Sequence, residues 1–124
     1  MINNKDAVSL AEPTFTLTVT DLSDDRATIA LSGRFDVVEA LSVREQLAGA
    51  ELAATRHLTV DLRTVTFVDS AGLAVLARAR RDRALVGGSV TLIRPTSEEA
   101  MRVFRLTQFD QIFTMMEQPE DGAL

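Results

Sequence analysis

The stretch Val65-Thr66-Phe67-Val68-Asp69-Ser70-Ala71-Gly72-Leu73 begins as a short apolar run and passes directly into a segment rich in alanine and arginine. Aspartate and serine favour the N-cap, the residue just before the first helical residue, because their side-chain oxygens accept hydrogen bonds from backbone N–H groups that lack partners there. We therefore expect Ser70 to lie at a strand-to-helix junction, near the positive end of the helix. By spacing alone, a plain helix cap is the favoured interpretation of this serine.

Two alternating segments and a helix precede the junction. Apolar and polar residues alternate over 14–22 and again over 26–35, and the turn residues 23–25 separate the two runs, which predicts an antiparallel hairpin. Asp36 is the natural cap of a helix predicted over 37–54. The expected apolar side of that helix consists of Val37, Ala40, Leu41, Val43, Leu47, Ala48 and Leu52.

Strands and helices continue to alternate around and after the junction. A third strand is predicted over 58–62, with 64–68 leading to the junction, and a second helix runs over 70–86 until Gly87-Gly88 ends it. The mostly apolar run 89–94 predicts a strand that is buried on both faces. The spacing of Thr96 and Glu99 is that of a capping box opening a third helix, and 110–116 is either an edge strand or a last helical turn.

The order β-β-α-β-α-β-α, followed by a short closing element, predicts an α/β fold. Its β-α-β-α-β part implies parallel strands, and the hairpin adds one antiparallel strand, so we expect a mixed sheet of four to five strands packed against helices. The 124 residues fit one domain. We place this domain at 14–116, between a leader over 1–13 and a polar tail over 117–124.

Composition excludes several classes of protein. The sequence has no cysteine, so it has neither disulfides nor thiolate metal sites, which favours a reducing compartment, and we expect the cytoplasm. We find no signal peptide and no apolar run long enough to cross a membrane. The net charge of −5 and the absence of Trp and Tyr argue against direct nucleic-acid binding.

Catalytic and metal-binding patterns are weak. His57 is the only histidine, and we expect it at the surface, without partners of metal-ligand spacing. The phosphate-binding loop and the nucleophile elbow are both absent. Asp36, Asp61 and Asp69 could lie near one end of the sheet, but carboxylates there more often cap helices. We therefore expect neither an enzyme nor a bound cofactor or metal.

The second helix carries several arginines that do not share one face. Arg78 and Arg81 lie on the side of Ser70 and Ala74, whereas Arg80 and Arg83 fall towards the apolar side, where their long stems can cover neighbouring surface. The strip formed by Ser70, Ala74, Arg78 and Arg81 is a candidate partner surface. The alternative is a solvated helix face.

Three motifs, together with the order of elements, give the chain a resemblance to a known family. They are Leu31-Ser32-Gly33-Arg34-Phe35-Asp36, then Val60-Asp61-Leu62 followed by Phe67 to Leu73, and finally Phe104 to Phe113. Over about 14–116 the sequence resembles a STAS domain, specifically a bacterial anti-sigma factor antagonist. The Asp-Ser-Ala-Gly-Leu motif is the most specific of the three. Gln108 departs from the pattern, since a glycine is common there.

The resemblance implies a partner-switching function. In that family the serine matching Ser70 is phosphorylated by a partner that is both a serine kinase and an anti-sigma factor. The unphosphorylated antagonist binds this partner and releases a sigma factor, and phosphorylation ends binding. Asp36 matches an aspartate associated with partner or nucleotide contact. The expected partner surface comprises Asp36, Asp69, Ser70, Gly72, Ala74, Arg78 and Arg81.

At Gly72, a side chain could obstruct the close approach of the partner, although plain local packing explains a glycine equally well.

The partner would supply the bound ATP, and the chain itself would be a monomer or a weak dimer. One alternative is a STAS-type binding subunit of a lipid-transport or signalling assembly without sigma factor control. Another is a small enzyme or nucleotide-binding domain, which would need the three aspartates around a cleft.

Overall fold

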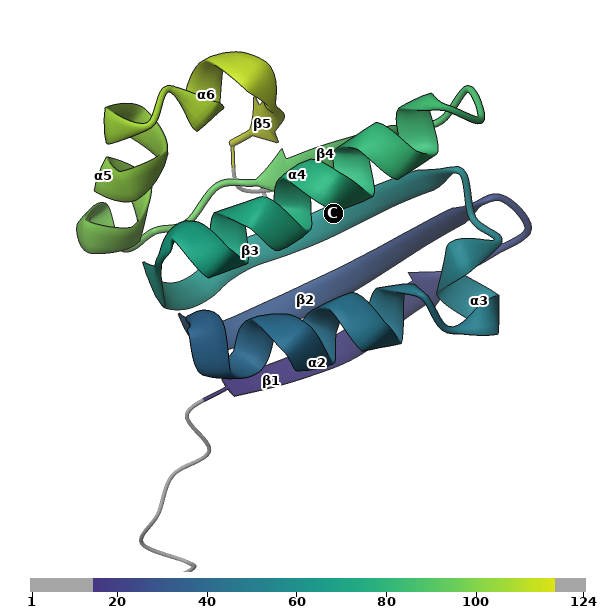
Figure 1. Ribbon diagram of the computed structural model, residues 1–124, viewed down its shortest axis with the longest axis horizontal. Helices are drawn as coiled ribbons and strands as arrows, with labels where there is room; N and C mark the ends of the chain where they lie inside the picture. Colours follow the sequence, from purple (N-terminus) through teal and green to yellow (C-terminus); the bar gives the residue numbers. More distant parts are fainter. Residues whose placement is uncertain (1–14, 118–124) are drawn as a thin grey trace, which may run out of the picture.

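The computed structural model describes residues 15–117 as one five-stranded sheet with helices on one face (Figure 1). The strands follow the chain order β1-β2-β3-β4-β5; β1 and β2 are antiparallel, and the later pairs are parallel. Their bounds are β1 Phe15–Leu22, β2 Arg26–Phe35, β3 His57–Val68, β4 Ser89–Ile93 and β5 Thr114–Met116. The predicted mixed α/β fold is confirmed. The expected leader and all but the first residue of the tail lie outside the described residues.

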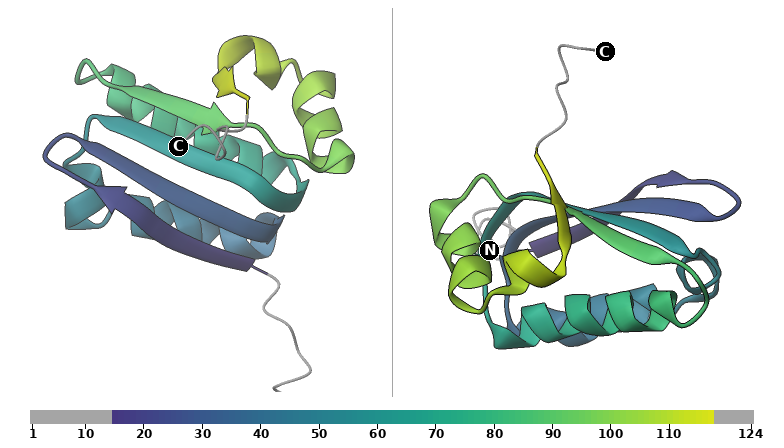
Figure 2. Two further views of the ribbon diagram at one scale, coloured as in Figure 1. Left: turned by 180° about the vertical axis from the view of Figure 1, so that it is seen from behind. Right: turned by 90° about the horizontal axis from the view of Figure 1, so that it is seen from above.

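The helices are α2 Val37–Leu47, α3 Ala50–Ala53, α4 Ser70–Ala84, α5 Glu98–Leu106 and α6 Phe109–Ile112. Figure 1 shows the two long helices, α2 and α4, lying side by side, and the edge-on view in Figure 2 shows both beneath the sheet. The view from behind shows the opposite face of the sheet without a helical layer. Across residues 15–117, no helix has the length and hydropathy needed to cross a membrane.

The core lies between the sheet and this helical layer. Alternate residues of β2 and β3 point into it, including Ile29, Leu31 and Val60, each 0% exposed. Removal of such side chains from water is the main stabilising contribution to the fold. The helices therefore sit where the apolar face of the sheet requires cover, and the carboxyl ends of β2 and β3 lie next to the N-termini of α2 and α4.

The helix predicted over 37–54 is interrupted in the structure. It ends at Leu47, and Gly49, a poor helix former, precedes the separate turn α3. The prediction that Val37 and Leu41 belong to its buried side was wrong, because only Ala40, Val43 and Leu47 of α2 face the sheet. Val37 and Leu41 lie on the flank of the helix that is turned towards α4.

Several predicted ends also differ in detail. The third strand, predicted over 58–62, extends without a break to Val68, with two irregularities in its pairing to β2. The N-cap of α5 is Ser97, which accepts from the backbone N–H of Ala100, whereas the predicted cap Thr96 donates its hydroxyl to the Arg63 carbonyl.

Two positions after α4 have a left-handed backbone, and the closing segment contains two elements. Gly87 has the left-handed φ of 79°, as expected for a glycine that ends a helix. The closing segment is both a helical turn, α6, and a short strand, β5. Gln108, where the resemblance implies a glycine, adopts a left-handed φ of 64° before α6.

Candidate functional site

The site is built around Asp69, whose carboxylate joins the starts of two helices. One oxygen, Oδ1, accepts from the backbone N–H groups of Ala71 at 2.9 Å and Gly72 at 3.1 Å, and so caps α4. The other oxygen, Oδ2, accepts from the backbone N–H of Val37, the first residue of α2, at 3.0 Å. Because each helix start carries partial positive charge, one carboxylate stabilises both.

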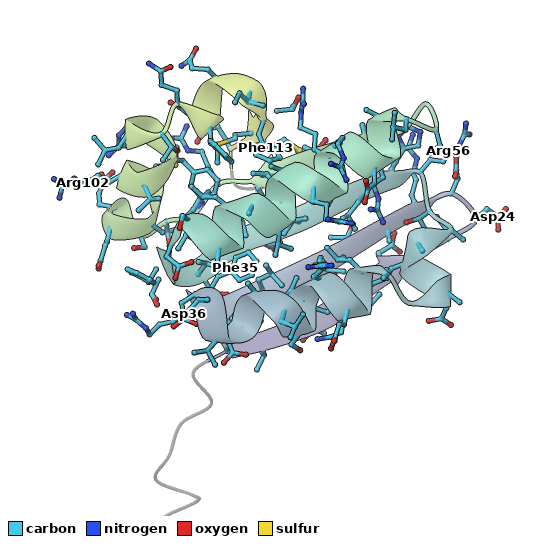
Figure 3. The ribbon with its side chains drawn as sticks, viewed as in Figure 1. Asp24, Phe35, Asp36, Arg56, Arg102 and Phe113 are labelled. Atoms are coloured by element: carbon cyan, nitrogen blue, oxygen red, sulfur yellow. The ribbon has the colours of Figure 1, made fainter. Side chains whose placement is uncertain are left out.

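Asp36 caps the neighbouring helix by the same chemistry. Its Oδ1 accepts from the backbone N–H groups of Val38 at 3.1 Å and Glu39 at 3.3 Å. The Arg34 guanidinium lies 3.8 Å from its Oδ2 and stacks over the Phe67 ring at 4.1 Å. Figure 3 shows Asp36 at the start of α2, beside the start of α4. The prediction of a cap at Asp36 is confirmed.

Ser70 is the first residue of α4 and is exposed. The interpretation of Ser70 as the helix cap is wrong, because Asp69 occupies that position and its side chain makes the capping hydrogen bonds. The Ser70 hydroxyl is thus presented to solvent directly after a carboxylate and at the positive end of a helix of 15 residues.

Gly72 is buried where α4 crosses the end of β2. A Cβ placed on it would lie 2.6 Å from the Phe35 carbonyl oxygen and 3.1 Å from the Phe35 ring. Since the nearest neighbour is backbone, it cannot move aside cheaply. The packing interpretation of Gly72 accounts for this glycine, and the burial places it beneath the surface that carries Ser70.

A groove of about 720 Å³ runs between α2 and α4, from Val37 and Ala71 near the helix starts as far as Arg81. Val37 is 66% exposed and Leu41 is 58% exposed, so α2 presents an apolar flank to it. Opposite them, α4 contributes the predicted strip residues Ala74, Arg78 and Arg81. The remaining lining residues are Ala40, Arg44, Ala71, Val75, Ala77 and Phe109. The structure therefore brings most of the predicted strip to one groove, adjoining Ser70 through Ala71.

The three aspartates do not assemble into one cluster. Asp61 lies in the middle of β3, seven residues before the strand ends, and its side chain points to the sheet face opposite the helices. There it accepts from Arg63 at 2.6 Å. Burial raises the pKa of Asp61, but the hydrogen bonds and the positive charge of Arg63 outweigh it and leave this pKa below its ordinary value. The expectation that Asp61 lies at the sheet end was wrong, because the strand continues past it.

Two further titratable groups, His57 and Arg56, lie at the start of β3, away from Asp69 and Ser70. His57 is the half-buried first residue of β3, and its Nδ1 lies 2.9 Å from the Ser89 hydroxyl. At the far end of the sheet, marked by Arg56 and Asp24 in Figure 3, Arg56 pairs with Asp25 at 2.6 Å. Within the described part of the chain, no three His, Cys, Asp or Glu side chains come together as a metal site.

Sequence reasoning missed the second partner of Asp69 and the exposed flank of α2. The link from Asp69 to Val37 joins residues 32 positions apart, so no local pattern reports it. The exposed flank had a weak signal, because Val37 and Leu41 lie at the margin of the apolar sector of the helical wheel.

Comparison with known proteins agrees with this architecture. A family model described as "Mlab, STAS domain" matches residues 18–117. Three solved structures share the fold. The anti-sigma factor antagonist SpoIIAA in its unphosphorylated form has a TM-score of 0.73 at 21% identity, covering 87% of this chain and 92% of that one.

The other two are of the same kind. An anti-sigma factor antagonist from Mycobacterium paratuberculosis has a TM-score of 0.70 at 23% identity, covering 91% of this chain and 93% of that one. The Bacillus cell fate determinant SpoIIAA in its phosphorylated form has a TM-score of 0.67 at 21% identity, covering 87% and 96%. With the family model spanning most of the sequence, the chain belongs to the STAS domain family.

Proposed function

We propose that this protein is an anti-sigma factor antagonist that is switched by phosphorylation of Ser70. In the unphosphorylated state it binds an anti-sigma factor that is also a serine kinase, and a sigma factor is released. Phosphorylation by that partner, which supplies the ATP, ends the complex. The protein itself performs no catalysis in this scheme and acts in the cytoplasm.

The observation that carries the proposal is the position of Ser70. Its exposed hydroxyl stands at the start of α4, beside a groove whose α2 flank is apolar and solvent-exposed. An exposed apolar flank that no part of residues 15–117 covers is a feature of partner surfaces. A kinase can reach this hydroxyl, and a bound partner on the groove would lie against it.

Electrostatics explains how one modification would end binding. A phosphoryl group adds about −1.5 to −2 charge at neutral pH. In the free protein this charge would be hydrated and close to the positive start of α4. In a complex it would be desolvated next to Asp69, whose negative carboxylate already accepts hydrogen bonds from backbone N–H groups at the starts of both helices. Each loss of about 1.4 kcal/mol weakens binding tenfold, so a few kcal/mol suffice.

The fold neighbours give this proposal its biological setting. The solved structures that share the fold include SpoIIAA in both an unphosphorylated and a phosphorylated form. The same STAS arrangement in the present chain supports the same kind of switch at the matching serine, Ser70.

A paired pull-down from native lysate tests the proposal. The baits are the wild type and Ser70→Asp, with Ser23→Asp as a control for added charge in the exposed turn before β2. We expect wild type and Ser23→Asp to retain an ATP-binding kinase and Ser70→Asp to lose it. Retention of the same kinase by all three baits would contradict a switch at Ser70.

A second pair of baits tests the groove. Leu41→Ser removes an apolar contact from its α2 flank, and the control Leu85→Ser removes another exposed leucine, 78% exposed, just beyond the end of α4. We expect the first to lose the kinase and the second to retain it, because only Leu41 lines the groove. Equal retention by both would place the partner elsewhere on the molecule.

The second candidate function is a STAS-type binding subunit of a lipid-transport or signalling assembly. The matching family model is described as a STAS domain and names no sigma factor, so the match fits this second function as well as the first. Such a subunit would bind its partner whether or not Ser70 carries a charge. Capture of the same non-kinase partner by wild type and Ser70→Asp would support it.

A further inference from the structure

A second cavity, of about 410 Å³, lies between the second half of α2, the turn α3 and the second half of α4. This volume falls within the range of small-molecule sites, about 300–1,000 Å³. It reaches neither Ser70 nor the start of either helix, but it shares Arg44, Val75 and Arg78 with the groove described above. The lining residues are Arg44, Leu47, Ala48, Ala53, Thr55, Val75, Arg78, Ala79, Asp82, Arg83 and Val86.

Arg83 is the unusual residue of this cavity, because its side chain is charged and yet only 6% exposed. Its Nη2 donates to the Leu52 carbonyl at 2.7 Å. The same carbonyl oxygen accepts from the hydroxyl of Thr55 at 2.8 Å and from its backbone N–H at 3.2 Å. Several donors therefore share this one carbonyl oxygen.

Within residues 15–117, the buried guanidinium of Arg83 does not have a hydrogen-bond acceptor for every donor. The Nε of Arg83 is buried and has no hydrogen-bond partner among residues 15–117. Burial lowers the pKa of Arg83, and the neighbouring Asp82 acts in the opposite direction. A guanidinium still remains charged in proteins, and a buried charge with unsatisfied donors is costly. Because Arg83 lines the cavity, an anion bound there would offset the positive charge of its guanidinium.

The rest of the lining has the composition of a site for an amphipathic anion. Three arginines face one acidic residue, Asp82, in a chain whose net charge is −5. Asp82 is itself engaged by Arg81 at 3.2 Å and by Arg78 at 3.9 Å. The other side chains of the cavity are almost all apolar, so a ligand without a hydrocarbon part would leave most of the wall uncovered.

We propose that this cavity binds a small oxyanion that carries a short hydrocarbon body, either a carboxylate or a phosphate monoester. Its head pairs with the arginines, and its body packs on the apolar wall formed by Leu47, Val75 and Val86. The proposal stands on Arg83 and the cavity and does not depend on phosphorylation of Ser70 or on a protein partner.

Titration of the isolated full chain tests this proposal. The probes are octanoate and octyl phosphate, which combine head and body, with octan-1-ol as the uncharged body and inorganic phosphate as the head alone. Calorimetry gives the affinity, and amide chemical shifts give the place of binding. We expect saturable binding of at least one combined probe, about tenfold tighter than octan-1-ol or phosphate, with shifts concentrated at Thr55, Ala79 and Arg83.

Variants on α4 assign the binding to the buried guanidinium. Arg83→Met removes the charge and keeps the length of the side chain, and Arg80→Met is the control on the same helix, exposed and outside the cavity. We expect the first to weaken binding about tenfold and the second to leave it unchanged. Should Arg83→Met fail to fold, Arg78→Met removes a more exposed arginine of the same wall and is expected to weaken binding in the same direction.

Three results would overturn the proposal. The first is the absence of saturable binding of either combined probe below about 10 mM. The second is octan-1-ol or phosphate binding as tightly as the combined probes, which would remove the need for an amphipathic anion. The third is equal weakening by the cavity variants and by Arg80→Met. None of these results bears on partner capture by the Ser70 surface.

Discussion

Replacement of Asp69 by alanine should cost considerably more stability than replacement of Asp36, although both residues cap helices. Asp36→Ala removes one N-cap, which costs about 1 kcal/mol. Asp69→Ala removes the N-cap of α4 and also the acceptor of the Val37 N–H at 3.0 Å. A hydrogen bond to a charged group contributes about 1.5 kcal/mol when partly exposed. We therefore expect a loss of about 2–3 kcal/mol for Asp69→Ala.

Thermal and urea unfolding measure this difference. For a domain of this size, 1 kcal/mol corresponds to about 4 °C in Tm, so the two alanine variants should differ by about 4–8 °C. The urea m-value should stay constant, because the surface exposed on unfolding does not change. Asp69→Asn gives an internal check: its single side-chain oxygen can cap α4 or accept from Val37 but not both, so its stability should lie between those of wild type and Asp69→Ala.

The reasoning would be refuted if Asp69→Ala and Asp36→Ala lost equal stability. That result would mean that the hydrogen bond between α2 and Asp69 contributes nothing, and that the two helix starts are positioned by packing alone.

Three further changes probe the scaffold of the site. Gly72→Ala should lower the free energy of unfolding in urea by about 1–2 kcal/mol. The new Cβ would lie 2.6 Å from the Phe35 carbonyl oxygen, and this clash outweighs the better helix propensity of alanine. Unchanged or higher stability would show that α4 shifts freely. Gln108→Gly should stabilise by up to about 1 kcal/mol in the same assay, since it relieves the left-handed φ of 64°; a loss would show that the glutamine side chain compensates its backbone strain. Asp61→Asn should destabilise by about 1–2 kcal/mol at neutral pH, because it weakens the pairing with Arg63. The pKa of Asp61 is lowered in the folded protein, so its ionised carboxylate stabilises the fold above the unfolded pKa of about 3.9, and this stability is lost as the pH falls through the folded pKa. Unfolding curves of wild type and variant should therefore converge in acid. A stability difference that stays constant with pH would contradict this.

Local patterns were sufficient to predict most of the fold. Strict alternation over 14–22 and 26–35 defines the hairpin, because a half-buried strand exposes every second residue. Asp36 identified a helix start, since capping is decided by the residue and its immediate neighbours. The composition of 110–116, in contrast, suits both a turn of helix and an edge strand, and only packing against β4 and α5 assigns its two halves.

Features that depend on contacts between distant segments could not be predicted in this way. The position of Asp61 depends on how far β3 extends, and the strand is prolonged by its pairing with β2 rather than by its own pattern. The exposure of Val37 and Leu41 depends on the angle at which α2 meets the sheet. The burial of Arg83 had a partial signal, because the helical wheel placed it on the apolar side, but its shared acceptor Leu52 lies 31 residues away.

Following modification and binding in one mixture shows most directly whether Ser70 is the switch of a partner-binding surface. The kinase captured by the wild-type bait is purified and mixed with ATP and either wild type or Ser70→Ala. Intact-mass spectrometry reports phosphorylation, and size-exclusion chromatography reports the complex. We expect wild type to gain one phosphoryl group on Ser70 and to leave the complex, and Ser70→Ala to stay unmodified and bound. Phosphorylation at another residue, or a wild-type complex that persists after full modification of Ser70, would contradict it.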